Sequence, residues 1–175
     1  MSVREPESFR GGILRTVAGV APQTIHSWRL ELGNRPGTGH KRYSATDAVA
    51  IRIMVMLVHQ GISASTGRSI VHGIMPELPR LIDDYRQERS KRGRWPQDGG
   101  IFAIVKNPCP VVPNHERSAW LNFVSAENLG DHLKDRSSGQ VIIVIPIWRA
   151  IYATLFKIEQ VVHGEIPADD TDHDL

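Results

Sequence analysis

The stretch GILRTVAGVAPQTIHSWRLELGNRPGTGHKRY, residues 12–43, decides the fold of the first half of the chain. Its first apolar residues recur on one side over two helical turns, and Gly19 follows them as a left-handed residue that ends a helix. Pro22 suits the first position of a second helix, because its missing N–H costs nothing there. Helical spacing then continues as far as Gly33. The stretch therefore predicts two short helices, the second over about residues 22–32.

The second helix has an apolar side, formed by Ile25, Trp28 and Leu32, and a polar side. Two helices joined by about three residues with a glycine have the spacing of a helix-turn-helix, whose second helix enters the major groove of DNA. Any short amphipathic helix pair shows this pattern, so a purely structural role stays open. The residues predicted to contact bases or phosphates are Gln23, Thr24, His26, Ser27 and Arg29, with Arg15 on the first helix.

Residues 34–43 combine turn-forming residues and cations, which predicts a small β-ribbon, or wing. Its basic side chains would neutralise backbone phosphates, while Tyr43 would pack or donate a hydrogen bond. The DNA-binding residues predicted here are Arg35, His40, Lys41, Arg42 and Tyr43.

Three helical segments follow the wing. The segment from Ser44 to Asp47 has capping-box spacing and opens a helix with one apolar side, which ends at Gly61. A further helix is predicted from about Ser63, broken or kinked by Pro76 and followed by a shorter apolar stripe.

Residues 12–75 resemble the winged helix-turn-helix of the MerR-like transcription regulators. The resemblance covers a little over a third of the chain. It is carried by the turn Val17-Ala18-Gly19-Val20, by Thr24-Ile25 with Trp28, by Lys41-Arg42-Tyr43-Ser44 before a capped helix, and by Leu57-Val58-His59-Gln60-Gly61-Ile62-Ser63.

The resemblance implies a dimer that grips a palindromic DNA site through two winged domains and, in many members, distorts promoter DNA. This chain departs from the family pattern at three positions. His26 stands where the family often has Arg, Arg29 stands where it has an acid, and Ala21 replaces the usual small polar cap. The base preference of the family therefore does not carry over.

The charge of the chain is divided unevenly. Residues 1–95 hold 15 Lys and Arg against 8 Asp and Glu, a net charge of +7, whereas residues 96–175 hold 6 against 11, a net charge of −5. A basic first half indicates a polyanionic partner, because each neutralised phosphate releases counterions. The alternative is that these cations only solvate helix faces.

The second half predicts a small sheet with helices. Val141–Ile145 is β-branched throughout without alternation, which predicts a strand buried on both faces. A final helix from Ile147 would pair with a second copy or, alternatively, pack on the sheet of its own domain. The remaining predicted elements are strands at 101–105 and 120–124 and a short helix or turn at 126–133. The predicted stripes of the final helix are Ile151, Leu155, Ile158 and Val162, and Trp148, Tyr152 and Phe156.

These patterns predict an α+β protein: a mostly helical winged helix-turn-helix domain, then a small α/β domain with a last long helix. A small-molecule or protein effector is expected at the second domain. The predicted divisions are a flexible arm at 1–11, the DNA-binding domain at 12–90, a linker at 91–100, the effector or dimerisation domain at 101–165, and an acidic disordered tail at 166–175.

The composition and the motifs argue against a membrane-spanning protein, a secreted protein and an enzyme. The chain is 41% hydrophobic, and no apolar run reaches the roughly 20 residues that span a bilayer. No secretory leader is visible, and the single cysteine, Cys109, fits a reducing cytosol. No nucleotide-binding or hydrolase motif occurs, so we expect no enzyme, cofactor or metal.

The leading hypothesis is a sequence-specific regulator of transcription that binds double-stranded DNA as a homodimer in the cytoplasm, associated with the nucleoid. One alternative is a DNA-architectural or recombination accessory protein that bends DNA. Another is an adaptor whose helix-turn-helix contacts proteins.

Overall fold

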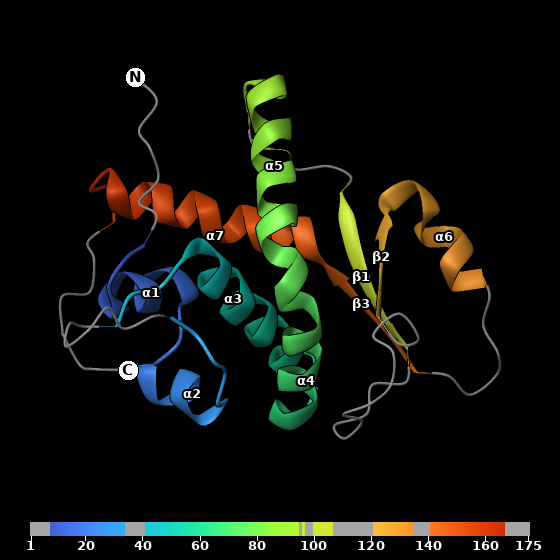
Figure 1. Ribbon diagram of the computed structural model, residues 1–175, viewed down its shortest axis with the longest axis horizontal. Helices are drawn as coiled ribbons and strands as arrows, with labels where there is room; N and C mark the ends of the chain where they lie inside the picture. The colour runs from blue at the N-terminus through green and yellow to red at the C-terminus, as the bar shows by residue number, and fades with distance from the viewer. Residues whose placement is uncertain are drawn as a thin grey trace.

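The computed structural model describes residues 8–33, 41–94, 96, 100–106, 121–134 and 141–166, and its centre is helix α3, which other helices enclose (Figure 1). The chain is α+β. In order, its elements are α1 (Gly11–Ala18), α2 (Pro22–Ser27), α3 (Ala45–His59), α4 (Ala64–Ile74), η1 (Met75–Glu77), α5 (Leu78–Arg92), β1 (Ile101–Lys106), β2 (Leu121–Ser125), α6 (Ala126–Lys134), β3 (Ile142–Pro146) and α7 (Ile147–Val162).

Helix α3 begins at the predicted capping box. The Ser44 hydroxyl accepts a hydrogen bond from the Asp47 N–H at 3.2 Å, and the Asp47 carboxylate accepts one from the Ser44 N–H at 2.7 Å. The prediction of a single apolar side was too narrow, because residues from Ala48 to Leu57 are buried on almost every side of the helix. A helix that is apolar all round must be covered all round.

Helices α1 and α2 form the predicted helix pair. Gly19 has a left-handed φ of 71° and donates its N–H to the Arg15 carbonyl, which ends α1 as expected. Three residues later, Pro22 opens α2 from the first helical position. The short turn and its glycine are therefore confirmed.

The predicted length of the second helix was wrong. Helix α2 ends at Ser27 instead of reaching residue 32, because Arg29 takes a left-handed φ of 53° and breaks the helical hydrogen-bond ladder. The apolar side nevertheless stays buried, with Trp28 6% and Leu32 3% exposed. Leu32 reaches the core from the irregular segment that follows the turn at Trp28 and Arg29.

Residues 8–11, the described part of the predicted flexible arm at 1–11, are structured. Phe9 is buried and forms a β-bridge with Tyr43, with backbone hydrogen bonds of 2.8 and 2.9 Å in the two directions. Helix α1 then begins at Gly11. An apolar side chain and a pair of backbone bonds therefore tie this end of the chain to the residues before α3.

Pro76 ends α4 in a single 3₁₀ turn, η1, and Pro79 lies within the first turn of α5, where a proline is tolerated. Helix α5 continues to Arg92, so the first residues of the predicted linker at 91–100 are helical. Its buried Tyr85 donates its hydroxyl to the Pro96 carbonyl at 2.8 Å. Burial, helped by Tyr152 and opposed by Arg89, raises the pKa of Tyr85 to about 12.

The second half contains a three-stranded antiparallel sheet in the order β2-β1-β3, and α6 follows β2 directly. The predicted strands and the short helix are confirmed within one or two residues. The prediction that the third strand is buried on both faces was wrong. Ile143 and Ile145 are buried, but Ile142, Val144 and Pro146 are only half-buried, because β3 lies at an edge of the sheet.

Helix α7 packs mainly against α3 and α1, and also against α5 and β1 (Figure 1). The predicted packing of this helix on its own sheet is confirmed at β1, but its larger contacts with α3 and α1 were not predicted. Helix α7 covers the side of α3 that the helices of the first half leave open. One hydrophobic cluster consequently contains residues of both halves, including Leu14, Ile51 and Leu155. The predicted linker therefore does not separate two cores.

One stripe of α7 was assigned incorrectly at its end. Ile151, Leu155 and Ile158 are buried as predicted, but Val162 is 38% exposed and Val161 is buried in its place. Of the predicted tail at 166–175, only Ile166 is described, and it packs partly against the core.

Several predictions fall outside the described residues. They are the tip of the wing at 34–40, Cys109 and its prolines, and the tail from residue 167. Within the described ranges, no helix is long and apolar enough to cross a membrane. Those ranges also contain no group of three or more His, Cys, Asp or Glu placed to hold a metal ion.

Replacing Leu155 by Ala tests the shared core. We expect the free energy of unfolding to fall by about 2–5 kcal/mol, because the change leaves a cavity between α7 and the first-half helices. Urea unfolding measures the loss, and amide exchange should show weaker protection in α3. Val162→Ala, on the exposed side of the same helix, is the control and should change stability by less than about 1 kcal/mol. Unchanged protection of α3 in Leu155→Ala would contradict the shared core.

Candidate nucleic-acid interface

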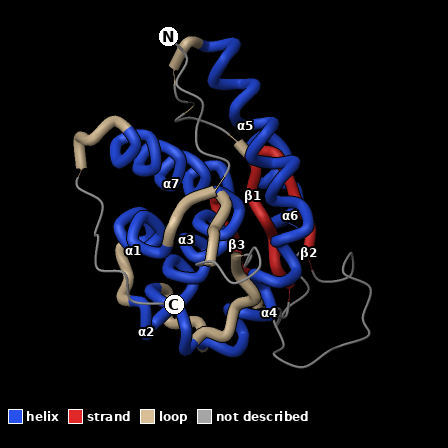
Figure 2. The backbone as a smooth tube through the Cα atoms, turned by 60° about the vertical axis from the view of Figure 1, so that its left-hand side comes forward, coloured by secondary structure: helices blue, strands red, loops and turns tan. Residues whose placement is uncertain are grey.

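Helix α2 presents a polar surface at the end of the molecule away from α6 (Figures 1 and 2). Its side toward the core is held by Ile25, which is 6% exposed, and by Trp28 just after it. The Ser27 hydroxyl donates a hydrogen bond to the Thr24 carbonyl at 2.7 Å, so its hydrogen is already used within the helix. The exposed residues predicted to contact DNA are Gln23, Thr24, His26 and Ser27.

Arg29 follows α2 and is exposed. Its φ of 53° is the only positive φ of a non-glycine residue in the described parts of the chain. The left-handed conformation costs an ordinary side chain about 1 kcal/mol, and glycine adopts it freely. Strained positions of this kind are concentrated at functional sites, so Arg29 becomes a stronger candidate than its sequence position indicated.

The two ends of the predicted wing lie against each other. A Cβ placed on Gly33, whose φ is 71°, would approach the Arg42 carbonyl to 2.7 Å and the Tyr43 ring to 2.9 Å. Only glycine therefore fits at residue 33. The segment between these ends, with Arg35 and His40, lies outside the described residues, so the β-ribbon itself stays a prediction.

Asp47 connects the end of the α2 segment to the start of α3. Its carboxylate accepts the Gly33 N–H at 3.1 Å through one oxygen and the Ser44 N–H and hydroxyl, at 2.7 and 2.8 Å, through the other. Asp47 is 8% exposed, so these bonds are largely shielded from water. Sequence reasoning identified the cap but missed the bond to Gly33, because that contact spans fourteen residues.

Arg52 acts at the other end of the same segment and was missed from the sequence. Its guanidinium, on α3, donates to the Val17 carbonyl near the end of α1 at 3.1 Å, and burial lowers the pKa of Arg52. Asp47 and Arg52 thus hold the backbone on either side of α2, at Gly33 and at Val17. We interpret both as positioning residues for α2.

The predicted wing cations are placed differently from one another. Arg42 is exposed, whereas Lys41 is half-buried with its Nζ 5.6 Å from the centre of the Tyr43 ring. Tyr43 is only 3% exposed, so its ring packs in the core and does not face a ligand. Arg15, on α1, is also partly buried. Of the predicted DNA-binding cations in the described residues, Arg29 and Arg42 are therefore the ones at the surface.

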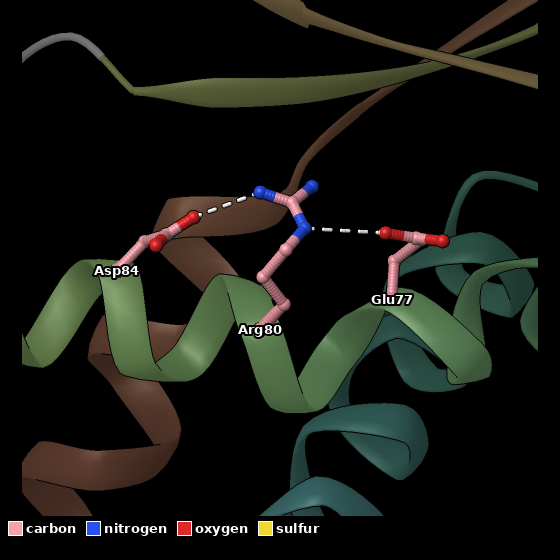
Figure 3. Close-up of polar contacts among 3 residues, drawn as sticks. All are labelled: Glu77, Arg80 and Asp84. Atoms are coloured by element: carbon pink, nitrogen blue, oxygen red, sulfur yellow. Dashed lines mark hydrogen bonds and ion pairs between the residues drawn. The ribbon is translucent and has the colours of Figure 1, made fainter.

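The cations of α5 differ from those near α2 in their surroundings. Arg80 bridges Glu77 and Asp84 at 3.3 and 2.9 Å (Figure 3), and Lys91 and Arg92 both contact Glu88. In contrast, no carboxylate in the described parts of the chain forms an ion pair with Arg29 or Arg42. Among the described residues, the exposed Arg94 and Arg149 likewise form no ion pair, so Arg29 and Arg42 are two of several cations available to an external anion.

The chain matches no protein-family model, and no curated protein matches its sequence.

Replacing Asp47 by Asn tests its role at the interface. The Asn amide nitrogen cannot accept a hydrogen bond, so at least one partner N–H loses its acceptor, and we expect a loss of about 1–3 kcal/mol in unfolding free energy. Faster exchange of the Gly33 amide should accompany this loss. Ser44→Ala removes the cap but leaves the Asp47–Gly33 bond, so it should cost about 1 kcal/mol and leave Gly33 protected. Equal Gly33 exchange in both variants would contradict the connection.

Proposed function

We propose that this protein is a sequence-specific regulator of transcription that binds double-stranded DNA, with α2 in the major groove. The observation that carries the proposal is the arrangement around α2: a short helix pair, an exposed polar face, and the exposed cations Arg29 and Arg42, which pair with no described carboxylate. The buried Asp47 and the half-buried Arg52, both on α3, hold the backbone before and after α2. Rigid support under an exposed polar helix is what base recognition requires.

The polar face of α2 contains groups that suit base edges. The Gln23 amide can pair with adenine in two hydrogen bonds, and Thr24 and His26 can donate or accept one each. At 1.5 Å per residue, the six residues of α2 span about 9 Å, which is close to three base pairs. Because a helix this short contacts few base pairs, we expect two copies of the protein to bind two repeated half-sites.

Arg29 and Arg42 would contact phosphates on either side of the groove that receives α2. Such contacts position a protein on the duplex and account for most of its salt-dependent affinity. The resemblance of residues 12–75 to MerR-like regulators supports the same docking. The departures at His26 and Arg29 support a base preference different from that of the family.

Arg42→Ala tests contact with the DNA backbone. We expect weaker binding to every duplex and a salt dependence that is lower by roughly one unit, because one phosphate contact is lost. Fluorescence anisotropy at several salt concentrations measures both. Arg149→Ala removes the same charge from the first turn of α7, directly after the sheet, and should leave the slope unchanged. Identical slopes for Arg42→Ala and the wild type would exclude Arg42 from the interface.

Arg29→Gly separates function from stability. Glycine relieves the left-handed strain, so the free energy of unfolding should stay equal or rise by up to about 1 kcal/mol. DNA affinity should nevertheless fall about tenfold, because the guanidinium is lost. Urea unfolding and anisotropy give the two values. Full affinity in Arg29→Gly would show that the side chain makes no contact with DNA.

Gln23→Ala tests sequence reading. Selection of duplexes from a random pool should yield a defined half-site with the wild type and a relaxed base at one position with Gln23→Ala, at a cost of about 1–3 kcal/mol for the preferred duplex. A pool that stays random with the wild type would favour an architectural DNA-binding protein. Absence of any retained duplex at low salt would favour an adaptor of proteins.

A further inference from the structure

Strand β3 forms an open edge of the sheet. Of the described strands, only β1 pairs with β3, in a continuous antiparallel register from Phe102↔Pro146 to Lys106↔Ile142. The strand contains no charged residue, and its register contains no bulge. Charges, prolines and bulges are the usual devices that keep an edge strand from pairing with another chain, and of these β3 has only Pro146, at its last position.

The outer face of β3 is also incompletely covered. Helix α6 packs over β2 and β1, on the face opposite the hydrophobic core. Ile142, Val144 and Pro146 point toward that outer face, and they remain half-buried and outside the core cluster. Strand β3 therefore has both an edge that no described strand pairs with and an outward-facing side made of apolar residues.

The opposite edge of the sheet is different. Strand β2 includes Asn122 and Ser125, and its last residue leads directly into α6, which packs against it. Its polar side chains make the β2 edge less apolar than β3, and α6 covers the face of the sheet beside it. Residues Ile142 to Ile145 of β3, in contrast, carry neither a polar nor a charged side chain.

We propose that β3 pairs with β3 of a second copy, antiparallel about a two-fold axis, so that the two sheets form one continuous sheet of six strands. A charge-free strand is complementary to itself: no like charges meet, and each half-buried Ile142 and Val144 gains an apolar neighbour. A charged partner would find no counter-charge on this strand.

The choice of a second copy rests on the proposed function, because a six-residue reading helix gains affinity from a repeated half-site. Helix α2 and strand β3 lie in different parts of the molecule (Figures 1 and 2), so pairing through β3 leaves both copies of α2 exposed. The proposal thus assigns DNA contact and dimerisation to separate surfaces.

The test uses the full chain and the variant Ile142→Glu. Ile142 lies opposite Lys106 on β1, so the new carboxylate gains an opposite charge within its own sheet and the fold is retained. In the dimer, the same carboxylate would be buried beside an apolar partner strand. Sedimentation velocity over a range of concentrations should give a dimer for the wild type and a dissociation constant at least about tenfold higher for Ile142→Glu. Ser125→Glu places the same charge on β2 and should remain dimeric.

Amide exchange in the wild type provides a measurement that does not depend on a variant. Protection of residues 142–145 should increase with protein concentration, while protection of β2 should not change. A wild type that stays monomeric, with β3 protected equally at all concentrations, would overturn the proposal and indicate that another part of the chain covers the edge. A dimer that survives Ile142→Glu would overturn it as well.

These outcomes are independent of the DNA experiments. A dimer that depends on Ile142 but binds no duplex would leave the β3 interface standing and remove the proposed function. A monomer that binds DNA would leave DNA binding standing and remove the β3 interface.

Discussion

The rest of the structure depends on the burial of α3 on almost every side. A helix without a polar face must be enclosed, and α1, α4 and α5 come from nearby sequence. The remaining cover is α7, which arrives only after the sheet. Since β3 ends at Pro146 and α7 begins at Ile147, the sheet is joined without a loop to the helix that supports α1. A displacement of the sheet would therefore be transmitted through α7 to α1 and the helix pair.

Two polar side chains on the same central helix define the position of α2. Asp47 binds the Gly33 N–H after α2, and Arg52 binds the Val17 carbonyl before it. Each bond is made at least partly away from water, where an unsatisfied partner is costly. The backbone before and after α2 is consequently attached to the most buried helix of the protein, while the polar face of α2 stays exposed.

The success of sequence reasoning depended on how local each feature was. The αL residue Gly19, the proline at Pro22 and the Ser44–Asp47 cap involve neighbours within a few residues, and all were predicted. Arg29 was placed inside a helix because apolar spacing continued to Leu32, yet the chain reaches the same burial through a turn. Phe9 and Tyr43 were assigned to an arm and a wing, since only their mutual pairing makes them core residues.

By itself the sequence determined the order of helices and strands, the short turn between the first two helices, the cap of α3 and the excess of positive charge in the first half, because each follows from local periodicity, turn chemistry or composition. Only the tertiary structure decided which apolar surfaces meet. It placed α7 against α3 and α1 and left β3 at an edge. It also connected Asp47 to Gly33 and Arg52 to Val17. These pairings join residues far apart in the chain, and apolar surfaces of similar composition have no preference among partners until packing and backbone geometry select one.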